Sequence, residues 1–255
     1  MAMIQHEITE GILKLTLQRA ERRNALTMEM YDSLCEALRL AEEDPAVRVV
    51  FISGEGQTFC AGNDIASFMG NPQVGDDSSV VQFLRTLIRC NTPIVAAIHG
   101  AAIGIGTTML LHCDLVYAAH GTKLALPFVN LGLVPEAGSS FLLPRIVGNA
   151  KAAELLLLGE SFSAESAKEM GLINEVVSAE TLQETAWAAA KALASKPPAA
   201  LRYSKALIRG AFLPALDEAL EAELQVFAKQ LTSPEAHEAF TALIEKRKPD
   251  FSKFS

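Results

Sequence analysis

The spacing of apolar residues alternates along the chain between a pattern typical of β-strands and a pattern typical of helices. Runs in which apolar residues alternate with polar ones, or follow one another, predict strands at residues 3–8, 11–17, 47–53, 94–98, 115–118 and 123–126. Apolar positions that recur every three or four residues predict helices after Thr27 and at residues 65–69, 80–89 and 104–113. This succession of strands and helices favours an α/β fold built in layers.

After Leu133 the pattern becomes almost entirely helical. Candidate helices lie at residues 164–170, 179–193, 199–209, 216–231 and 234–248. The fourth of them carries an apolar stripe made by Leu216, Leu220, Leu224, Phe227 and Leu231. Such a stripe packs either on the chain's own core or on a neighbouring subunit, and the spacing alone favours the chain's own core.

The stretch from Pro93 to Leu111 contains no formal charge and is long enough to suggest a membrane span. It is interrupted by His99, Gly100, Gly104 and Gly106. Its first part has the composition of a buried strand, and its second part is typical of a helix that begins after a glycine-rich turn. We therefore expect a strand, a turn and a helix here, and no membrane span.

Composition and charge narrow the possible classes of function. The chain of 255 residues is 50% apolar and 20% charged, which is typical of a globular protein. Its net charge is −8, so it lacks the positive field with which proteins bind nucleic acids. The four cysteines contain no CxxC pair, which indicates neither a zinc site nor a disulfide framework. The first ten residues lack the features of a signal peptide, and we expect a cytoplasmic protein without a metal.

Two glycine-containing loops follow predicted strands, at residues 54–59 and 104–109. Each begins like a dinucleotide-binding fingerprint but lacks the third glycine, which disfavours NAD. Such loops can present backbone N–H groups at the start of a helix, where these donors stabilise an anionic oxygen. The simpler alternative is a tight turn whose dihedral angles require glycine. Serine hydrolase chemistry is not expected, because the chain has no GxSxG motif.

Glu136 is the single carboxylate in an otherwise apolar loop, residues 128–141, that leads into a helix. Apolar surroundings raise the pKa of a carboxyl group and make it an effective base. A glutamate in the first turn of a helix would instead have its pKa lowered by the helix dipole, and without further context this second interpretation is favoured. For His112, which adjoins Cys113, we expect a buried neutral histidine rather than a metal ligand.

Six segments, in order along the chain, resemble landmarks of the crotonase (enoyl-CoA hydratase/isomerase) superfamily. They are Arg22-Arg-Asn-Ala-Leu26, Phe59-Cys-Ala-Gly-Asn-Asp64, Pro93-Ile-Val-Ala-Ala-Ile-His-Gly-Ala-Ala-Ile-Gly104, Cys113-Asp114, Asn130-Leu-Gly-Leu133 and Glu245-Lys-Arg-Lys-Pro-Asp-Phe251. The resemblance runs nearly end to end, and within the superfamily the chain looks most similar to the peroxisomal-type Δ3,Δ2-enoyl-CoA isomerases.

The resemblance implies a crotonase-like spiral of ββα units over residues 1–195. It also implies a C-terminal helical region over residues 196–255 that packs on the core and on neighbouring subunits, which moves the apolar stripe toward a subunit interface. The implied substrate is a coenzyme A thioester, with no cofactor apart from the coenzyme A of the substrate. The implied assembly is a homotrimer, or a hexamer formed by two trimers.

The resemblance also assigns chemical roles. The backbone N–H groups of Asn63 and Ile105 match the pair that holds the thioester oxygen while an enolate forms. The two glutamates with which hydratases activate water are replaced here by Thr108 and Phe128, which disfavours hydration because neither can act as an acid or a base. Glu136 matches the catalytic glutamate of the Δ3,Δ2-isomerases, and this match reverses the preference stated above for the helix-dipole interpretation.

For coenzyme A, the resemblance implies a channel lined largely by backbone atoms. The implied residues are Arg23, Asn24, Ala25, Ala61, Gly62, Asp64 and Ile65. The basic run from Lys246 to Lys248 is a candidate phosphate contact, and the alternative is ordinary dipole complementarity at a helix C-terminus. Phe68, Met69 and Phe128 are candidate walls of the acyl pocket, and plain core packing is their alternative.

The resulting prediction is an isomerase that moves the double bond of a 3-enoyl-CoA to the 2-position with Glu136 as the single base. One alternative is a ring-opening isomerase of the 1,2-epoxyphenylacetyl-CoA type, whose members carry an aspartate at this position. Another crotonase-fold acyl-CoA enzyme is a further alternative. The last is a catalytically silent subunit that binds acyl-CoA.

Overall fold

The computed structural model describes residues 3–65, 75 and 77–254. Its largest sheet has the strand order β1-β2-β3-β4-β6-β9. The strands are β1 (Ile4–Thr9), β2 (Ile12–Leu17), β3 (Val49–Gly54), β4 (Ile94–Ile98), β6 (Leu115–Ala119) and β9 (Glu175–Val177). β1 is antiparallel to β2, and the other neighbouring pairs are parallel. The expected α/β fold is confirmed.

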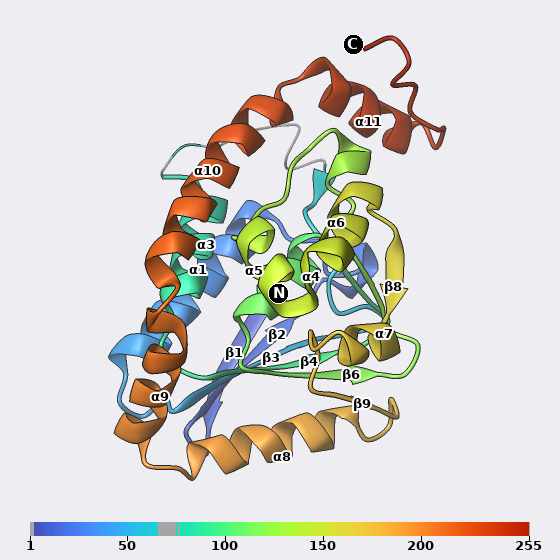
Figure 1. Ribbon diagram of the computed structural model, residues 1–255. Coiled ribbons are helices and arrows are strands. Elements are labelled where there is room, and N and C mark those ends of the chain that lie inside the picture. The colour runs from blue at the N-terminus through green and yellow to red at the C-terminus, as the bar shows by residue number, and fades with distance from the viewer. Residues whose placement is uncertain (1–2, 66–74, 76, 255) are drawn as a thin grey trace.

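The two faces of this sheet are buried by different helices. Val50 and Ile52 of β3 belong to the main core, which helices α1 and α3 also help to form. Val49 and Phe51 point to the opposite face and pack with residues of helix α8. Figure 1 shows α8 below the sheet and most of the other helices above it. The bounds are α1 (Met28–Glu43), α3 (Ser79–Arg89) and α8 (Leu182–Ala194).

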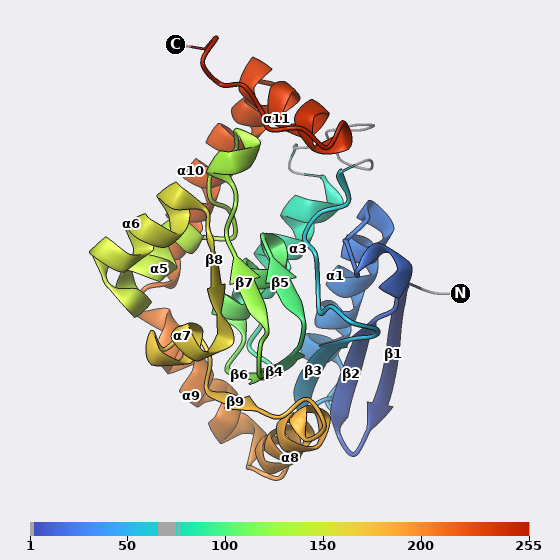
Figure 2. The same cartoon turned by 90° about the vertical axis from the view of Figure 1, so that its right-hand side faces the viewer.

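The uncharged stretch from Pro93 to Leu111 forms a strand, a turn and helical segments, as expected. After β4 it continues into β5 (Ala101–Ile103), α4 (Ile105–Thr108) and the 3-10 helix η2 (Met109–His112). β5 pairs with β7, and β7 pairs with β8, so a small second sheet stands above the large one (Figure 2). Within the described residues no helix is both long enough and apolar enough to cross a membrane.

Helices dominate the second half of the chain. The remaining elements are β7 (Lys123–Ala125), β8 (Ser161–Ser163), α5 (Ser139–Val147), α6 (Asn149–Leu158), α7 (Ala164–Glu169), α9 (Pro198–Gly210), α10 (Leu213–Leu231), α11 (Pro234–Ile244) and the 3-10 helices η1 (Ala20–Arg22) and η3 (Val129–Leu131). The last helix stops at Ile244, short of the expected residue 248. It ends there because Lys246 adopts a left-handed backbone, with φ at 55°.

The apolar stripe of α10 packs on the chain's own core. Leu216 and Leu220 are 2% and 1% exposed and belong to the main core. Phe227 and Leu231 belong to a second cluster that also contains Phe128. The expectation that this stripe forms a subunit interface is therefore wrong, because the side chains are already covered within one chain.

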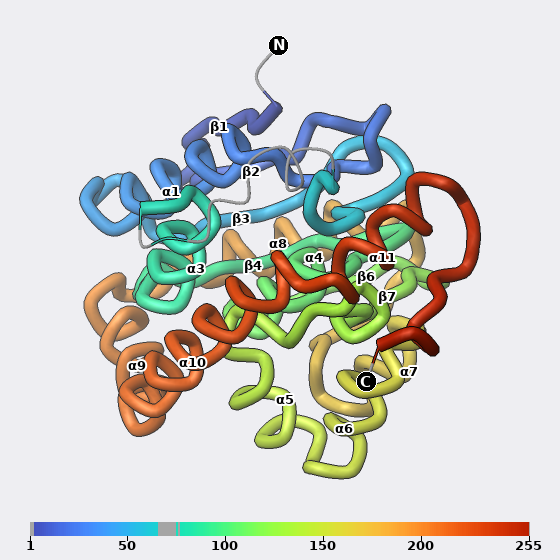
Figure 3. Tube along the Cα trace, turned by 90° about the horizontal axis from the view of Figure 1, so that it is seen from above, coloured from blue at the N-terminus to red at the C-terminus, as the bar shows by residue number. Residues whose placement is uncertain are grey.

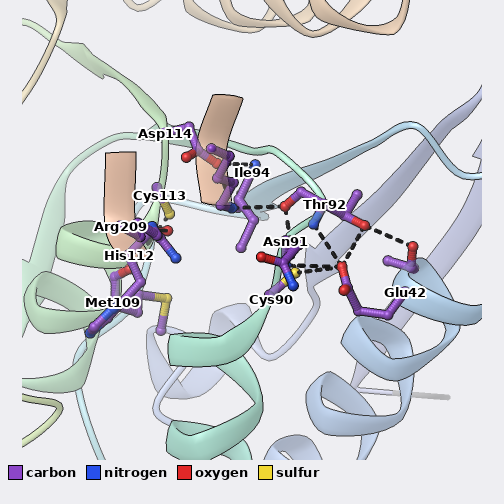
Figure 4. A network of polar contacts seen from close by, with 12 residues as sticks. Glu42, Cys90, Asn91, Thr92, Ile94, Met109, His112, Cys113, Asp114 and Arg209 are labelled. Carbon is purple, nitrogen blue, oxygen red and sulfur yellow. Dashed lines mark hydrogen bonds and ion pairs between the residues drawn. The ribbon is translucent and has the colours of Figure 1, made fainter. Parts of the chain in front are cut away.

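Helix α9 is fixed to the core by basic side chains on one of its faces. These side chains donate to backbone carbonyl groups, in the pairs Arg202 to Ala41, Lys205 to Thr92 and Arg209 to His112. Lys205 also pairs with Asp114 over 2.7 Å, and Asp114 accepts a hydrogen bond from the N–H of Ile94. Figure 4 shows the same region, where Thr92 and Asp114 lie beside the start of β4. This end of the C-terminal region is thus anchored in its own chain.

Candidate active site

Cys60 joins two segments that lie far apart in the sequence. Its N–H donates to the carbonyl of Ala101 over 3.1 Å, and its own carbonyl accepts from the N–H of Ile103 over 3.0 Å. The loop that follows Cys60 also bonds to residues 23–26, because the N–H of Leu26 donates to Gly62 over 2.8 Å. The loop at 60–64 and the strand that leads into α4 are therefore held in a fixed relation.

Each of these two segments offers a free backbone donor. The N–H groups of Asn63 and Ile105 have no acceptor among the described residues. Ile105 is the first residue of α4, where the helix itself cannot use the N–H group. Both residues line the same pocket. The pair expected from the sequence is thus brought together with its hydrogen atoms unused.

Glycine is required at two positions beside these donors. Gly104 has φ 56° and ψ −120°, a backbone conformation that a side chain would strain. A Cβ atom on Gly106 would lie 2.7 Å from the carbonyl oxygen of Cys60 and 2.9 Å from its Cβ atom. Any larger residue at 106 would therefore push α4 away from the loop at 60–64.

The donors lie in a largely apolar pocket with a cavity volume of about 90 Å³. Its lining is Ala61, Gly62, Asn63, Ile65, Ile103, Gly104, Ile105, Pro127, Phe128, Leu131, Leu133, Phe227 and Phe240. Phe227 belongs to α10 and Phe240 to α11, two helices that run one after the other across the top of the molecule (Figure 3). The C-terminal helices thus form part of the pocket wall of their own chain.

Glu136 lies in the loop before α5 and is 5% exposed. The hydroxyl group of Thr108 donates a hydrogen bond to Oε1 of its carboxylate. Burial raises the pKa of Glu136 to about 8; the hydrogen bond from Thr108 opposes this effect and the nearby Glu223 adds to it. The expected effect of apolar surroundings on this pKa is confirmed. Glu136 does not lie in the first turn of a helix, because α5 begins at Ser139.

Glu136 does not line the pocket. Its neighbours, however, belong to or contact the segments that do. Thr108 ends the short helix that Ile105 begins. Tyr31 donates its hydroxyl hydrogen to Oδ1 of Asn63, and the charge of Glu136 contributes to raising the pKa of this buried Tyr31 hydroxyl, after desolvation. Glu136 is therefore coupled by contact to one donor segment and by charge to a neighbour of the other.

The expected coenzyme A residues lie together along the loop at 60–64 and its neighbour at 23–26. Asn24 is 0% exposed as a whole residue, and its side chain donates to the carbonyl groups of Glu55 and Thr58, so it supports this segment from within. Asp64 pairs with Arg19 over 2.6 Å. These contacts fix the shape of the two segments, and Arg23 is exposed.

Two further sets of expected residues have different outcomes. Phe68 and Met69 lie outside the described residues. Lys246 and Lys248 are exposed, whereas Arg247 between them pairs with Glu238 and Glu245. Within the basic run, only the two lysines are therefore open to a phosphate group.

Several pocket and site residues were not expected from the sequence. They are Tyr31, Leu131, Leu133, Glu223, Phe227 and Phe240. Tyr31 and Phe227 occupied regular apolar positions on their helices, a pattern that indicates core packing and contains no signal for a site. In the described part of the chain no group of three or more His, Cys, Asp or Glu side chains could hold a metal ion. His112 is buried, and desolvation lowers its pKa to about 3, as expected for a neutral histidine.

Comparison with known proteins gives a consistent family. The family described as enoyl-CoA hydratase/isomerase matches residues 7–253. The chain is 36% identical to the 1,2-epoxyphenylacetyl-CoA isomerase of Escherichia coli over 99% of both chains. It is 38% identical to rat enoyl-CoA delta isomerase 2 over 78% of this chain and 52% of that protein, and 34% identical to a mitochondrial enoyl-CoA hydratase of Pongo abelii over 95% and 83%.

Solved structures agree with these sequence matches. An enoyl-CoA hydratase/isomerase of Pseudoalteromonas atlantica superposes with a TM-score of 0.94 at 39% identity, over 98% of this chain and 100% of that one. OdaA of Pseudomonas aeruginosa superposes with a TM-score of 0.92 at 45% identity, over 95% and 98%. Relatives named for three different reactions match at similar identity, so the choice of reaction depends on the residues of the site.

Proposed function

Because this chain belongs to the enoyl-CoA hydratase/isomerase (crotonase) family and is an enzyme of acyl-CoA thioesters, we propose that it moves the double bond of a 3-enoyl-CoA to the 2-position. The observation that carries the proposal is the pairing of one buried carboxylate with two free N–H donors. Glu136 is bonded to Thr108, on the short helix whose first residue, Ile105, offers one of these donors. One base and one oxyanion site are sufficient for this reaction.

The steps balance without a cofactor. Glu136 removes a proton from C2 of the thioester, and the electrons move onto the carbonyl oxygen to give a dienolate. The N–H groups of Asn63 and Ile105 donate to that oxygen, a contribution worth about 3–4 kcal/mol for each donor in comparable sites. Glu136 then returns the proton to C4, which leaves the double bond between C2 and C3.

Two residues argue against hydration. Thr108 and Phe128 occupy the positions that match the paired glutamates of the hydratases, so neither of these positions supplies a carboxylate to activate water. Thr108 uses its hydroxyl hydrogen on Glu136, and Phe128, 5% exposed, lines the pocket with an apolar ring. Water is thereby kept from the side of the pocket where a hydratase would hold it.

A second candidate is the ring-opening isomerisation of 1,2-epoxyphenylacetyl-CoA. It is favoured by the 36% identity over 99% of both chains to the Escherichia coli enzyme of that name. The glutamate at position 136, where enzymes of that type are expected to carry aspartate, favours the 3-enoyl-CoA reaction instead.

The test is a panel of three thioesters given to the purified enzyme: a 3-enoyl-CoA, a 2-enoyl-CoA and 1,2-epoxyphenylacetyl-CoA. We expect formation of the conjugated thioester from the first, followed by its ultraviolet absorbance, and slow or absent hydration of the second. Turnover of the epoxide alone would replace the proposal by the second candidate. Tight binding without any turnover would identify a silent acyl-CoA-binding subunit.

The pH dependence of kcat/KM should follow the ionisation of Glu136. The base must be deprotonated in the free enzyme, and its pKa is raised to about 8. We therefore expect kcat/KM to rise with pH through neutrality and to level off above about pH 8. A profile measured with the 3-enoyl-CoA should therefore change between about pH 6 and about pH 9, the range in which a group with this pKa titrates. A flat profile over this range would contradict the assignment.

A matched variant, Thr108→Val, separates this carboxylate from other groups. Valine keeps the shape of threonine but removes the hydroxyl group, whose hydrogen bond lowers the pKa of Glu136. The rising limb of the profile should therefore move to higher pH, while the activity at the plateau stays close to that of the wild type. An unmoved limb would show that another group titrates.

We also propose that the enzyme is a homotrimer, or a hexamer of two trimers, in which the C-terminal region contacts neighbouring subunits. Tyr203, Leu207 and Ile208 on α9 are 71%, 80% and 72% exposed in the single chain, and an apolar patch of this kind is typical of an interface. Light scattering on the eluting protein should give about three or six times the 27.4 kDa chain mass. A mass equal to one chain would contradict the proposal.

The proposed coenzyme A contacts are the backbone of Arg23, Ala25, Ala61, Gly62, Asp64 and Ile65, with Lys246 at the phosphates, and Asn24 supports this segment from within. The acyl chain is proposed to lie against Phe128. No bound cofactor other than the coenzyme A of the substrate enters this scheme.

A further inference from the structure

The turn that carries Glu136 has an unusual backbone. The N–H of Ser139 donates to the carbonyl of Glu136 over 3.0 Å, which closes the turn. Both central residues, Ala137 and Gly138, are left-handed, with φ at 59° and 69°. This conformation is unfavourable for alanine, and Ala137 is fully buried. The turn therefore depends on its neighbours to keep its shape.

Helix α10 holds the turn from one side. Oε2 of Glu223 accepts the N–H of Gly138 over 2.6 Å, and Oε1 accepts the N–H of Ser140 over 2.9 Å and its hydroxyl over 2.5 Å. Leu216 lies earlier on the same face of this helix and packs closely on Gly138. A Cβ atom on Gly138 would lie 2.2 Å from Cδ1 of Leu216. Glu223 is 7% exposed, so these bonds are shielded from water.

The 3-10 helix η2 holds the turn from another side. Nε2 of His112 lies 2.7 Å from the carbonyl oxygen of Ala137, and the histidine is 1% exposed. A carbonyl oxygen only accepts, so Nε2 of the neutral ring must carry the hydrogen. Desolvation, together with the charge of Arg209, lowers the pKa of His112 to about 3 and keeps the ring neutral. Arg209 of α9 in turn donates to the carbonyl of His112, as labelled in Figure 4.

We propose that Glu223 and His112 are positioning residues. Together they hold the left-handed turn in place and thereby orient the Glu136 carboxylate toward the substrate. Glu223 binds the N–H groups of the turn, and His112 binds its carbonyl. Neither side chain lines the pocket or touches the free donors. The inference rests on the proposed function of Glu136 and extends it to residues that no part of that chemistry uses.

The charge of Glu223 adds a second consequence. The groups that interact with Glu136 are Tyr31 from α1, Cys60, Thr108 from α4 and Glu223 from α10. The neutral His112 bonds to the next residue, Ala137. Glu223 is the one carboxylate in this set, and its negative charge raises the pKa of Glu136. Loss of this charge should therefore make Glu136 ionise at lower pH.

The test is Glu223→Gln, with Glu221→Gln as the matched control. Glu221 lies on the same helix, but it is 47% exposed and pairs with Arg85 on the surface. We expect Glu223→Gln to lower kcat by about 10²-fold with little change in KM, because a misaimed base slows the chemical step but not binding. The rising limb of the pH profile should also move to lower pH. Glu221→Gln should leave both unchanged.

A second pair of variants guards against misfolding. His112→Leu removes the donor to Ala137, whereas His112→Gln keeps a side-chain N–H of similar reach. We expect His112→Gln to retain more of the kcat than His112→Leu at equal folded fraction. A loss of kcat that follows the folded fraction alone, with no shift of the pH profile and no rescue by glutamine, would overturn the proposal.

Two measurements do not need turnover. Amide hydrogen exchange at Gly138 and Ser140 should become faster in Glu223→Gln and stay unchanged in Glu221→Gln. The infrared band of the protonated Glu136 carboxyl group, identified by its loss in Glu136→Gln, should titrate at lower pH in Glu223→Gln. If the wild type isomerises no 3-enoyl-CoA, the proposed function fails, and unchanged exchange and titration would separately overturn the positioning role.

Discussion

Replacement of Glu136 by glutamine is expected to lower kcat for 3-enoyl-CoA isomerisation by about 10²–10⁴-fold, the range found when a general base is removed. Glutamine keeps the size of the side chain and can still accept the hydrogen bond from Thr108, but it cannot take a proton from C2. The measurement is the rate of formation of the conjugated thioester at saturating substrate. KM should change little, because binding depends on the pocket and the N–H donors.

The stability of this variant separates loss of chemistry from loss of fold. The pKa of Glu136 in the folded protein is about 8, above its ordinary value of 4.5. A carboxyl group with a raised folded pKa binds more protons when folded, so wild-type stability falls as the pH rises between those two values. Glu136→Gln lacks this loss, and its unfolding midpoint relative to wild type should therefore improve with pH.

A surface variant serves as the control for this experiment. Glu154→Gln removes an exposed carboxylate of α6 that pairs with Lys151, and it should keep the wild-type kcat. An active Glu136→Gln enzyme would remove Glu136 from the mechanism. A variant that is inactive because it has unfolded would be recognised by a loss of its unfolding transition.

Replacement of Asp114 by alanine is expected to destabilise the fold by about 3 kcal/mol, near the lower end of the cost of leaving a buried charge unpaired. Lys205 has 5% of its side chain exposed and donates to Asp114 over 2.7 Å. The same carboxylate accepts the N–H of Ile94, as seen beside the start of β4 in Figure 4. The expected cost lies near the lower end of that range because 27% of the Asp114 side chain is exposed.

Denaturant unfolding gives the free energy directly. Asp114→Ala combined with Lys205→Met should recover part of the loss, because the charge that was left unpaired is then also removed. The exposed pair of Lys151 and Glu154 provides the contrast, and Glu154→Ala should cost only about 0.5 kcal/mol. If Asp114→Ala also cost only about 0.5 kcal/mol, this result would show that the ammonium group of Lys205 is solvated by other means.

Much of the fold could be predicted from local patterns. Strands β1, β2, β3, β4 and β6 of the large sheet, helix α1 with its cap at Thr27, and the strand and turn after Pro93 each show the apolar spacing of their element. The short strand β9 of the same sheet was not predicted. Helix α6 could not be predicted in this way, since the sequence of Asn149–Leu158 has only three polar residues and ends in four leucines. Leu157 and Leu158 at its end remain 70% and 56% exposed, so apolar residues do not mark its buried side alone.

The site could be predicted only where short segments form it. The N–H groups of Asn63 and Ile105 follow from motifs of a few residues each. The contact of Glu223 with Ser140 joins positions 83 residues apart, and in the sequence Glu223 is one of several glutamates on a helix. Likewise, only the three-dimensional packing of α10 and α11 brings Phe227 and Phe240 to the pocket.

The bonds through Cys60 have a consequence for the energetics of any oxyanion formed in this pocket. Because the segments that carry the two donors are bonded to each other, their dipoles become aligned when the protein folds and do not have to turn when charge develops on the substrate. In water, by contrast, solvent dipoles must rotate for every such event. The reorganisation energy of the site is therefore small, and the two backbone hydrogen bonds of the buried Cys60 contribute to this by holding the two segments together.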